Sequence, residues 1–475
     1  MIWDNQRVTW TKTHIPNPKP QIPRKRRWVL GIGIWTLGFV LLLAGVSPLV
    51  AAVKPPKLQY QLLTLPNGLR VILSEDHSTP IAHVAVWYHV GSKNERAGRT
   101  GFAHLFEHMM FKGSQNVDPD SHTSLIAGVG GRSNAYTTED ETVFWQTVPA
   151  NYLPIVLWLE ADRMATLRID EDAFKREREV VKEERRMRIE NQPYGRLNEI
   201  IFDHAFTTHP YKHPTIGSMM DLEAASVVDV REFHKTFYVP ANATVTIVGD
   251  FDAAQTIQLV NQYFARVPRG AGPVPRSIPK EPEQKQEKRA VVSEAWPLPA
   301  VVVGYHVTYD GHPDAYPLHV VGKILSDGNS SRIPRELMYN KRLALTAFGS
   351  SNITEDPNLF YAVAVLQPGR TAAEAEKALI EEFEKLTREP ISASELQRAK
   401  NQWARDYILS RETIQEKAMH LAHAAVIHND IGTADGEFEI FMNVTTADIQ
   451  RVAKTYFTEA NRVVLHVLPK EGGSR

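Results

Sequence analysis

The chain has 475 residues, of which 43% are hydrophobic and 23% charged, with a net charge of −1 and no cysteine. This length and balance are typical of a globular protein with two or more hydrophobic cores. The near-zero charge gives no electrostatic reason to expect binding to nucleic acid or to an acidic substrate. The lack of cysteine excludes disulfide bonds, thiolate metal ligands and a cysteine nucleophile.

Residues 1–53 are predicted to form a basic N-region followed by a signal peptide or a membrane anchor. Four basic residues, 24–27, precede an uncharged run over residues 28–53. That run is long enough to span a bilayer, which takes about 20 apolar residues. Small residues end at Ala52, so the segment is either cleaved after Ala52 or kept as an anchor. In both cases the basic cluster stays inside, and we expect a periplasmic or membrane-anchored protein whose body lies outside the cytoplasm.

Residues 101–110 offer a metal site on a single predicted helix. They contain His104, Glu107 and His108 in the order His-x-x-Glu-His. Because residues three and four apart are neighbours on a helix, both imidazoles can bind one metal ion while Glu107 stands beside it. This order of residues is the inverzincin signature of zinc hydrolases.

A second helix is predicted over residues 170–189, which open with acidic residues suited to a helix N-terminus. On a wheel of about 3.6 residues per turn, four apolar residues share one arc: Phe174, Val180, Val181 and Met187. Glu177 and Glu184 fall in the middle of that arc, whereas Glu179, Glu183 and Glu190 point away. Carboxylates on a buried stripe cost free energy unless a cation or hydrogen-bond donors compensate them, and a metal ion would do so.

Several shorter motifs accompany these two helices. They lie at residues 67–71 (Asn-Gly-Leu-Arg-Val), 130–137 (Gly-Gly-Arg-Ser-Asn-Ala-Tyr-Thr), 238–242 (Tyr-Val-Pro-Ala-Asn) and 249–250 (Gly-Asp). Together with the two helices, they resemble the pitrilysin and mitochondrial processing peptidase family of inverzincin zinc metallopeptidases. The resemblance covers about residues 58–470 and is more specific in the first half.

The resemblance implies zinc-dependent hydrolysis of peptide bonds. The family's third zinc ligand is a Glu at the position of Glu184, so one Zn²⁺ per chain would be held by this residue with His104 and His108. Glu107 would take a proton from the attacking water and deliver it to the leaving amine. Glu177 matches a carboxylate that orients a ligand. Two imidazoles and a carboxylate favour zinc over calcium or magnesium, which prefer oxygen ligands.

Residues 131–137 look like the family's active-site strand, whose free edge pairs with an extended peptide. Asn134 and Ala135 would lie nearest the scissile bond. Main-chain hydrogen bonds would then provide affinity with little sequence preference. We therefore expect the substrate to be an extended or unfolded peptide.

An internal repeat predicts a duplicated domain. Residues 229–242 recur as residues 448–461, and each copy runs into a β-branched strand. We expect an α+β fold of two homologous domains, each a β-sheet covered by helices, that form half of a clamshell. The predicted boundaries are 54–266 for the zinc-bearing catalytic domain, 267–299 for a Pro-rich and charged linker, and 300–475 for a degenerate second copy without a metal site. In that copy Ala399 replaces Glu177, and no His-x-x-Glu-His follows residue 299.

The chain departs from its resembling family in the second half. Members that act alone have an Arg and, seven residues later, a Tyr that hold the substrate, but Met338 and Leu345 stand at those positions. Neither side chain can donate a hydrogen bond. Arg332 and Tyr339 have the right spacing, although using them shifts the register by six residues. We expect a homologous partner subunit to supply the Arg and Tyr across a heterodimer interface.

Two other functions remain open from the sequence: a structural subunit without catalysis, and a module that binds extended peptides without cutting them. Other histidines give no clear metal site. His204, His209 and His213 resemble a family segment near the active site, but their spacing does not require a metal. His420 and His423 are predicted to be packing or surface residues, because no Asp or Glu accompanies them at ligand spacing.

Overall fold

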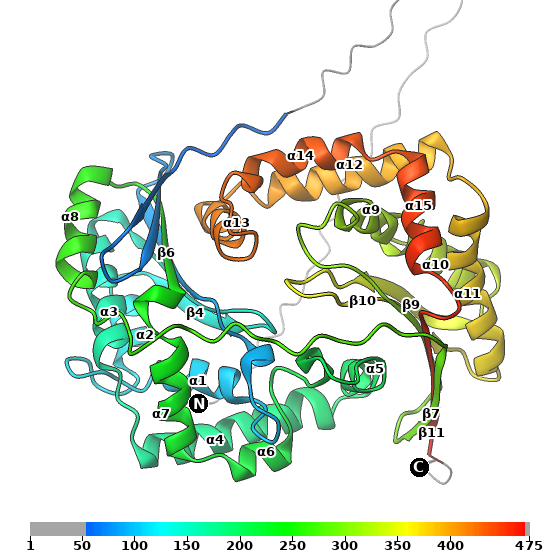
Figure 1. The fold of residues 1–475 in the computed structure, drawn as a ribbon, viewed down its shortest axis with the longest axis horizontal. Helices are drawn as coiled ribbons and strands as arrows, with labels where there is room; N and C mark the ends of the chain where they lie inside the picture. The colour runs from blue at the N-terminus through cyan, green and yellow to red at the C-terminus, as the bar shows by residue number, and fades with distance from the viewer. Residues whose placement is uncertain (1–53, 471–475) are drawn as a thin grey trace, which may run out of the picture. The chain divides into compact units, whose positions relative to one another are not determined.

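The computed structural model describes residues 54–470, so the N-terminal segment predicted over residues 1–53 lies outside the described range. Within residues 54–470, no helix is long and apolar enough to cross a membrane. The described chain contains two β-sheets, each with helices packed against it (Figure 1). The predicted α+β class with two sheet-and-helix domains is confirmed.

The first sheet has the strand order β1-β2-β6-β3-β5-β4. Its strands are β1 (Gln61–Thr64), β2 (Arg70–Glu75), β3 (Ile81–Tyr88), β4 (Arg132–Thr137), β5 (Thr142–Pro149) and β6 (Ala243–Gly249). Strands β2 and β6 run parallel, and the other neighbours are antiparallel. Strand β4 is therefore the edge strand at one end of this sheet.

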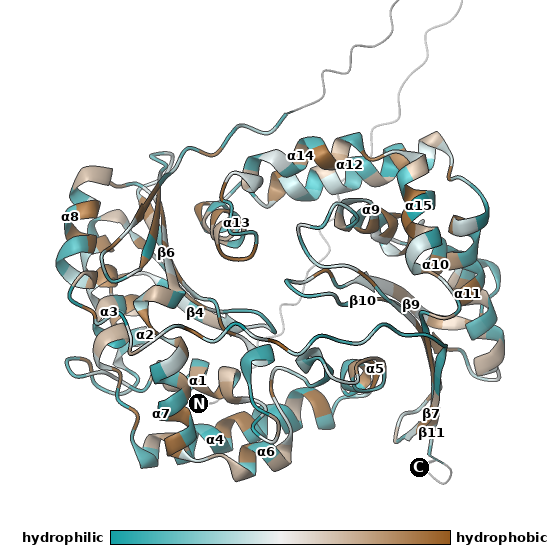
Figure 2. Ribbon diagram, in the orientation of Figure 1, coloured by the Kyte–Doolittle hydropathy of each residue, from teal (hydrophilic) through white to brown (hydrophobic). Residues whose placement is uncertain are grey.

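The helices of the first half lie between β3 and β4, between β5 and β6, and after β6. They are α1 (Phe102–Met109), α2 (Ser121–Gly128), α3 (Leu153–Thr166), α4 (Glu171–Arg185), α5 (Leu197–Ala205), α6 (Met219–Ala224), α7 (Val227–Phe237) and α8 (Ala253–Phe264). Short helical turns are η1 (Ser92–Asn94), η2 (Ala150–Tyr152), η4 (Pro210–Lys212) and η5 (Pro240–Asn242), and a π-helical turn, η3 (Arg186–Glu190), continues α4. Helices α4 and α7 carry hydrophilic and hydrophobic residues in alternation (Figure 2), as amphipathic helices on a core do.

The second sheet has the order β7-β11-β8-β10-β9. Its strands are β7 (Lys288–Glu294), β8 (Ala300–His306), β9 (Ala344–Ser351), β10 (Leu359–Leu366) and β11 (Arg462–Pro469). The helices of this half are α9 (Ala315–Ser326), α10 (Arg332–Pro334), the π-helical turn η6 (Arg335–Asn340), α11 (Ala372–Arg388), α12 (Ala393–Leu409), α13 (Ile414–Val426), α14 (Thr433–Asn443) and α15 (Thr446–Tyr456).

The second sheet repeats the first without β1, since one parallel pair (β7 with β11) is followed by three antiparallel neighbours. The sequence repeat coincides with α7 and β6 in one half and α15 and β11 in the other. Both copies begin with a capping box. At their ends, Asn242 and Asn461 each donate to the carbonyl oxygen five residues earlier, at 2.8 and 2.7 Å. Identical side chains thus make identical contacts, and the predicted duplication is confirmed.

Strand β7 lies inside the range 267–299 that the sequence predicts to be a linker. Its side chains alternate between partly buried and exposed, and it pairs in parallel with β11. Its charged residues, Lys288, Arg289 and Glu294, concealed this alternation in the sequence. The connection between the two sheets therefore ends at residue 287.

One helix from each half packs against the sheet of the other half. Helix α13 belongs to the second half by sequence, yet Ala418 and Leu421 share a hydrophobic cluster with Ile72 and Val248 of the first sheet. Conversely, α5 of the first half packs on the second sheet in a cluster that includes Ile201. The two halves are therefore joined through shared hydrophobic clusters as well as through the chain between them.

Candidate metal centre

The start of α1 is fixed by a buried carboxylate and a glycine. Glu95 accepts hydrogen bonds from the N–H groups of Gly101 and Ala103, at 2.9 and 2.7 Å. Gly101 has φ = +88°, and a Cβ there would lie 2.6 Å from the carbonyl oxygen of Ile216. Only glycine meets both conditions without strain. These contacts set the rotation of α1 and hence the direction of its histidines.

Helices α1 and α4 bring the three predicted ligands together. Glu184 Oε2 lies 3.8 Å from His104 Nε2 and 3.4 Å from His108 Nε2. One ligand atom from each residue lies within 4.8 Å of the others. Zinc bonds of about 2.0–2.2 Å in a tetrahedral arrangement hold ligand atoms about 3.4 Å apart. The donor set therefore fits a zinc ion with little movement of side chains.

Charged side chains contact the atoms of His108 and Glu184 that face away from the centre of the cluster. Glu177 Oε2 lies 3.5 Å from His108 Nδ1, while Lys112 Nζ lies 2.9 Å from Glu177 Oε1. Arg188 holds Oε1 of Glu184 at 2.6 Å and so leaves Oε2 facing the imidazoles. Glu177 thus contacts the far nitrogen of a histidine, as a carboxylate that orients a metal ligand does.

The electrostatics of the cluster favour a positive charge beside His108. Burial lowers the pKa of His108, but the carboxylates of Glu177 and Glu184 outweigh burial and raise that pKa to about 9. Burial dominates at His104 and lowers its pKa to about 4, which keeps this imidazole neutral and able to ligate. A field that favours imidazolium also favours a bound cation.

Glu107 lies between the metal-ligand cluster and strand β4. The hydroxyl of Thr137, the last residue of β4, donates to Glu107 Oε2 at 2.6 Å. Burial raises the pKa of the Glu107 carboxyl, and the Thr137 hydroxyl partly opposes the shift. The carboxylate is thus held on the face of α1 that carries both histidines.

The predicted buried arc of α4 is correct in its centre and wrong at one flank. Phe174 and Val181 are buried, and so is Glu177. In contrast, Val180 and Met187 are 47% and 58% exposed. Both lie about 60–80° from Glu177 on a 3.6-residue wheel. Apolar character alone does not show how far the covering elements extend around a helix.

The edge of β4 carries the two predicted substrate residues. Asn134 and Ala135 pair with Trp145 and Phe144 of β5, and in the described structure the sheet order ends at β4. Asn134 is exposed and Ala135 partly buried. The second edge of this strand is therefore the side from which an added strand would approach.

A cavity of about 370 Å³ joins these parts. It is lined by residues of the metal cluster, of β4 and of the second half, including His104, Thr137, Glu184, Arg188, Tyr211 and Asn352. Neither Arg188 nor Asn352 could be identified from the sequence, because their positions in this cavity arise from tertiary contacts. Asn352 shows that the second half contributes to the wall around the metal ligands.

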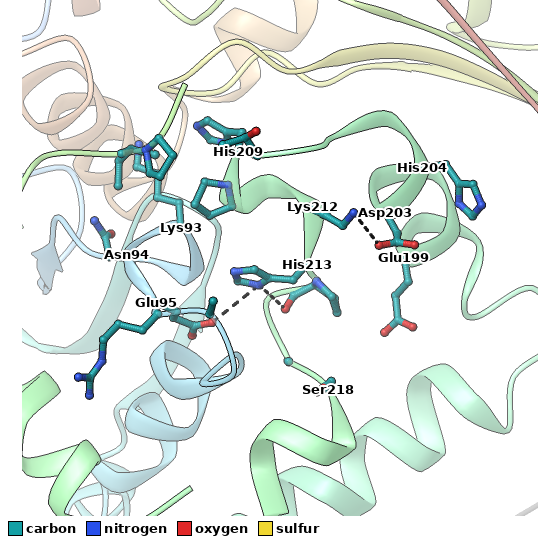
Figure 3. Close-up of a pocket in the computed structure, with 18 of the residues that line it drawn as sticks. Lys93, Asn94, Glu95, Glu199, Asp203, His204, His209, Lys212, His213 and Ser218 are labelled. Carbon is teal, nitrogen blue, oxygen red and sulfur yellow. Dashed lines mark hydrogen bonds and ion pairs between the residues drawn. The ribbon is translucent and has the colours of Figure 1, made fainter. Parts of the chain in front are cut away.

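A larger cavity, of about 790 Å³, adjoins this one and is lined by one histidine in the last turn of α5 and two that follow this helix (Figure 3). His204, His209 and His213 line it, and His213 Nδ1 lies 3.8 Å from Glu95 Oε2. Both cavities share Glu199, His213 and Pro214 in their linings. The segment predicted to lie near the active site is therefore next to the metal-ligand cluster.

The alternative substrate-holding pair is Arg332 and Tyr339, of which Arg332 is already paired with a carboxylate. Arg332 makes two hydrogen bonds to the Glu395 carboxylate, at 2.9 and 2.7 Å. Tyr339 is 52% exposed in the turn η6. At the positions that match the family, Met338 is partly buried and Leu345 is 53% exposed on β9.

The chain is similar to known proteins over most of its length. Residues 70–218 match the family model described as insulinase (peptidase family M16), and residues 224–403 match the model described as the peptidase M16 inactive domain. The zinc protease PqqE of Helicobacter pylori is 33% identical over 416 residues, which cover 86% of this chain and 93% of that protein.

Solved structures show the same fold. The crystal structure of a protease from Helicobacter pylori has a TM-score of 0.83 and 32% identity, and covers 87% of this chain and all of that one. The periplasmic protease PqqL from Escherichia coli has a TM-score of 0.71 and 16% identity, and the match covers 88% of this chain but 49% of PqqL. The two-domain chain thus corresponds to half of that longer fold, as predicted.

Proposed function

Because the chain belongs to peptidase family M16, we propose that it is a zinc-dependent endopeptidase that hydrolyses peptide bonds of extended or unfolded peptides. The observation that carries this proposal is the cluster of His104, His108 and Glu184, whose ligand atoms lie within 4.8 Å of one another beside Glu107. Two His and one Glu are a known ligand set of catalytic zinc, with a fourth position left open. We propose one Zn²⁺ per chain in this centre.

The chain's own residues would then share the work of hydrolysis. When bound, Zn²⁺ would polarise the substrate carbonyl and lower the pKa of a water molecule to about 7. Glu107 takes a proton from the attacking water and passes it to the leaving amine. Thr137 positions the Glu107 carboxylate through its 2.6 Å hydrogen bond. Glu177 orients His108 through the imidazole nitrogen that faces away from Glu184.

The substrate would add a strand to the edge of β4. Asn134 and Ala135 lie on this strand, whose last residue, Thr137, contacts Glu107. A peptide paired along β4 would therefore place one of its peptide bonds near the metal ligands. Recognition through main-chain hydrogen bonds explains why an extended or unfolded peptide, rather than a folded protein, is the proposed substrate.

We further propose that the chain is the catalytic subunit of a heterodimer. The match to half of a longer fold and the residues Met338 and Leu345 support this proposal. A homologous partner would supply the missing Arg and Tyr. The proposed division is a catalytic domain over residues 54–266 and a degenerate copy over residues 300–475. The apolar segment within residues 1–53 would export the body to the periplasm or anchor it to the membrane.

The competing function is a peptide-binding or structural subunit without catalysis. It predicts an altered metal centre, whereas His104, Glu107, His108 and Glu184 are all present and clustered. The deciding experiment measures bound zinc and the cleavage of an unfolded peptide by the purified chain with its partner. Zinc-dependent cleavage that a chelator abolishes is the expected result. Peptide binding without cleavage would support the competing function, and cleavage that needs no metal would overturn the proposal.

A further inference from the structure

A second group of metal-ligating side chains lies in the other half of the chain. Asp310 follows β8, His423 is on α13, and His428 lies two residues beyond the end of that helix. Asp310 Oδ1 lies 3.2 Å from His428 Nε2, and Asp310 Oδ2 lies 3.4 Å from His423 Nε2. Ligand atoms of all three residues fall within 4.8 Å of one another. No Asp or Glu accompanies His423 at ligand spacing in the sequence, but Asp310, which comes from a distant part of the sequence, lies beside it in the fold.

The hydrogen bonds of Thr433 fix the tautomer of His428. The Thr433 hydroxyl donates to the carbonyl oxygen of Asp430 at 2.7 Å, so towards His428 Nδ1, 2.9 Å away, it must act as an acceptor. The neutral imidazole then carries its proton on Nδ1 and a lone pair on Nε2. That lone pair points at the Asp310 carboxylate, which is also an acceptor. A cation is needed between them, either a second proton on His428 or a metal ion.

The surroundings of this cluster suit a metal ion. The buried Nε2 atom of His428 makes no hydrogen bond of normal geometry to any residue in the described part of the chain. The side chain of His428 is 5% exposed and that of His423 43% exposed, so the cluster is enclosed on one side and open to solvent on the other.

We propose that Asp310, His423 and His428 bind a second zinc ion, which takes no part in hydrolysis at the first centre. Two imidazoles and a carboxylate select zinc over calcium or magnesium. Helix α13 packs against the first sheet, while Asp310 follows β8 of the second. The ion would therefore link α13, which packs on the first sheet, to the segment after β8 of the second sheet. In this way it would stabilise the contact between the two halves.

Metal analysis of the purified full chain separates the two sites. The expected content is two zinc ions for the wild type, one for Glu184→Gln, one for Asp310→Asn and none for the double variant. His77→Asn is the matched control, because His77 pairs with Asp250 at 2.6 Å outside both clusters, and it should retain two. One zinc ion in the wild type and none in Glu184→Gln would show that Asp310 and His428 form only an ion pair, which overturns the proposal. If the catalytic centre instead failed to bind zinc, Glu184→Gln would keep one ion and Asp310→Asn none.

Two further measurements do not depend on the folding of Asp310→Asn. In the Glu184→Gln background, calorimetric titration should show one zinc site, and zinc should raise the thermal midpoint. Thr433→Val removes the hydroxyl that fixes the His428 tautomer, so zinc affinity at this site should fall about 10- to 100-fold. Thr455→Val removes a hydroxyl that donates to the Arg451 carbonyl and should leave zinc affinity unchanged. No zinc binding in the Glu184→Gln background, or equal affinities of the two threonine variants, would refute the second site.

Discussion

Glu107→Gln is the substitution that separates chemistry from metal binding in this centre. Glutamine has nearly the same shape as glutamate, and its carbonyl oxygen can still accept the hydrogen bond from Thr137. It cannot accept a proton at neutral pH. The ligand atoms of His104, His108 and Glu184 do not depend on Glu107, so the variant should keep its zinc.

The expected loss follows from the role of a proton carrier. General acid–base catalysis contributes about 10²–10⁴-fold to rate. At 1.36 kcal/mol per tenfold change, this range corresponds to an increase of about 2.7–5.4 kcal/mol in the activation barrier. Thr137→Val should lower the rate by less, because the carboxylate remains but loses the hydroxyl that positions it.

The assay compares kcat/KM on an unfolded peptide for both variants and the wild type, all with measured zinc content. Glu107→Gln should bind peptide and zinc normally while kcat falls, since proton transfer belongs to the chemical step. A zinc-loaded Glu107→Gln protein with activity within tenfold of the wild type would remove Glu107 from this role. A loss of zinc in this variant would contradict the geometry of the ligand cluster.

Two further predictions concern the ligands and the stability of the fold. Glu184→Gln should remove the catalytic zinc, whereas Glu177→Gln should weaken its binding about 10- to 100-fold, and Glu183→Gln should not alter it; metal titration of the three variants checks the assignment. Burial lowers the pKa of His83 to about 3, so the fold holds this imidazole neutral. Its contribution to stability is complete above an unfolded pKa of about 6.5 and falls by about 1.4 kcal/mol per pH unit below it, or about 2 kcal/mol at pH 5. Urea unfolding at pH 7 and pH 5 should therefore show a smaller pH dependence for His83→Gln than for the wild type, and equal dependences would contradict the shift.

The proposed metal ligands could be predicted from the sequence, because their relative positions depend mostly on spacing within single helices. A spacing of four residues places His104 and His108 on one helix face whatever surrounds the helix. The seven-residue spacing of Glu177 and Glu184 does the same on α4, and burial of Glu177 agrees with it. Only the meeting of the two helices needed a family resemblance or a structure. The repeated segments could be predicted for a similar reason, since each continues a helix that begins with its own capping box.

Features that depend on contacts between distant segments could not be predicted from the sequence. Val180 is apolar but exposed, because burial depends on the elements that cover a helix and not on the helix itself. Strand β7 is rich in charge, and only its pairing with β11 identifies it as sheet. The pairing of Asp310 with His423 joins the segment after β8 to α13, and no spacing rule relates them.

The two halves differ in what their corresponding sites can do, and this difference leads to the last prediction. In the second half, the buried Ala399 stands where the repeat places Glu177 in the first half, so we expect no counterpart of the first metal centre there. Its edge strand β9 presents Leu345, which offers no hydrogen-bond donor to a substrate. Arg332, the donor of the alternative pair, already donates hydrogen bonds to both carboxylate oxygens of Glu395. On the proposed function, the chain would therefore carry all three zinc ligands but lack the donors that hold the transition state.

One transition-state donor is typically worth about 10²–10³-fold in rate. We therefore expect the isolated chain to be nearly inactive on an unfolded peptide, and a homologous partner that carries the Arg and Tyr to raise its activity by at least about 10²-fold. Tyr339→Phe should leave the activity of the complex unchanged, whereas replacing the partner's Tyr should abolish the stimulation. Full activity from a verified monomer or homodimer would refute the need for a partner. A loss of that activity in Tyr339→Phe would then show that the shifted pair had replaced the missing one.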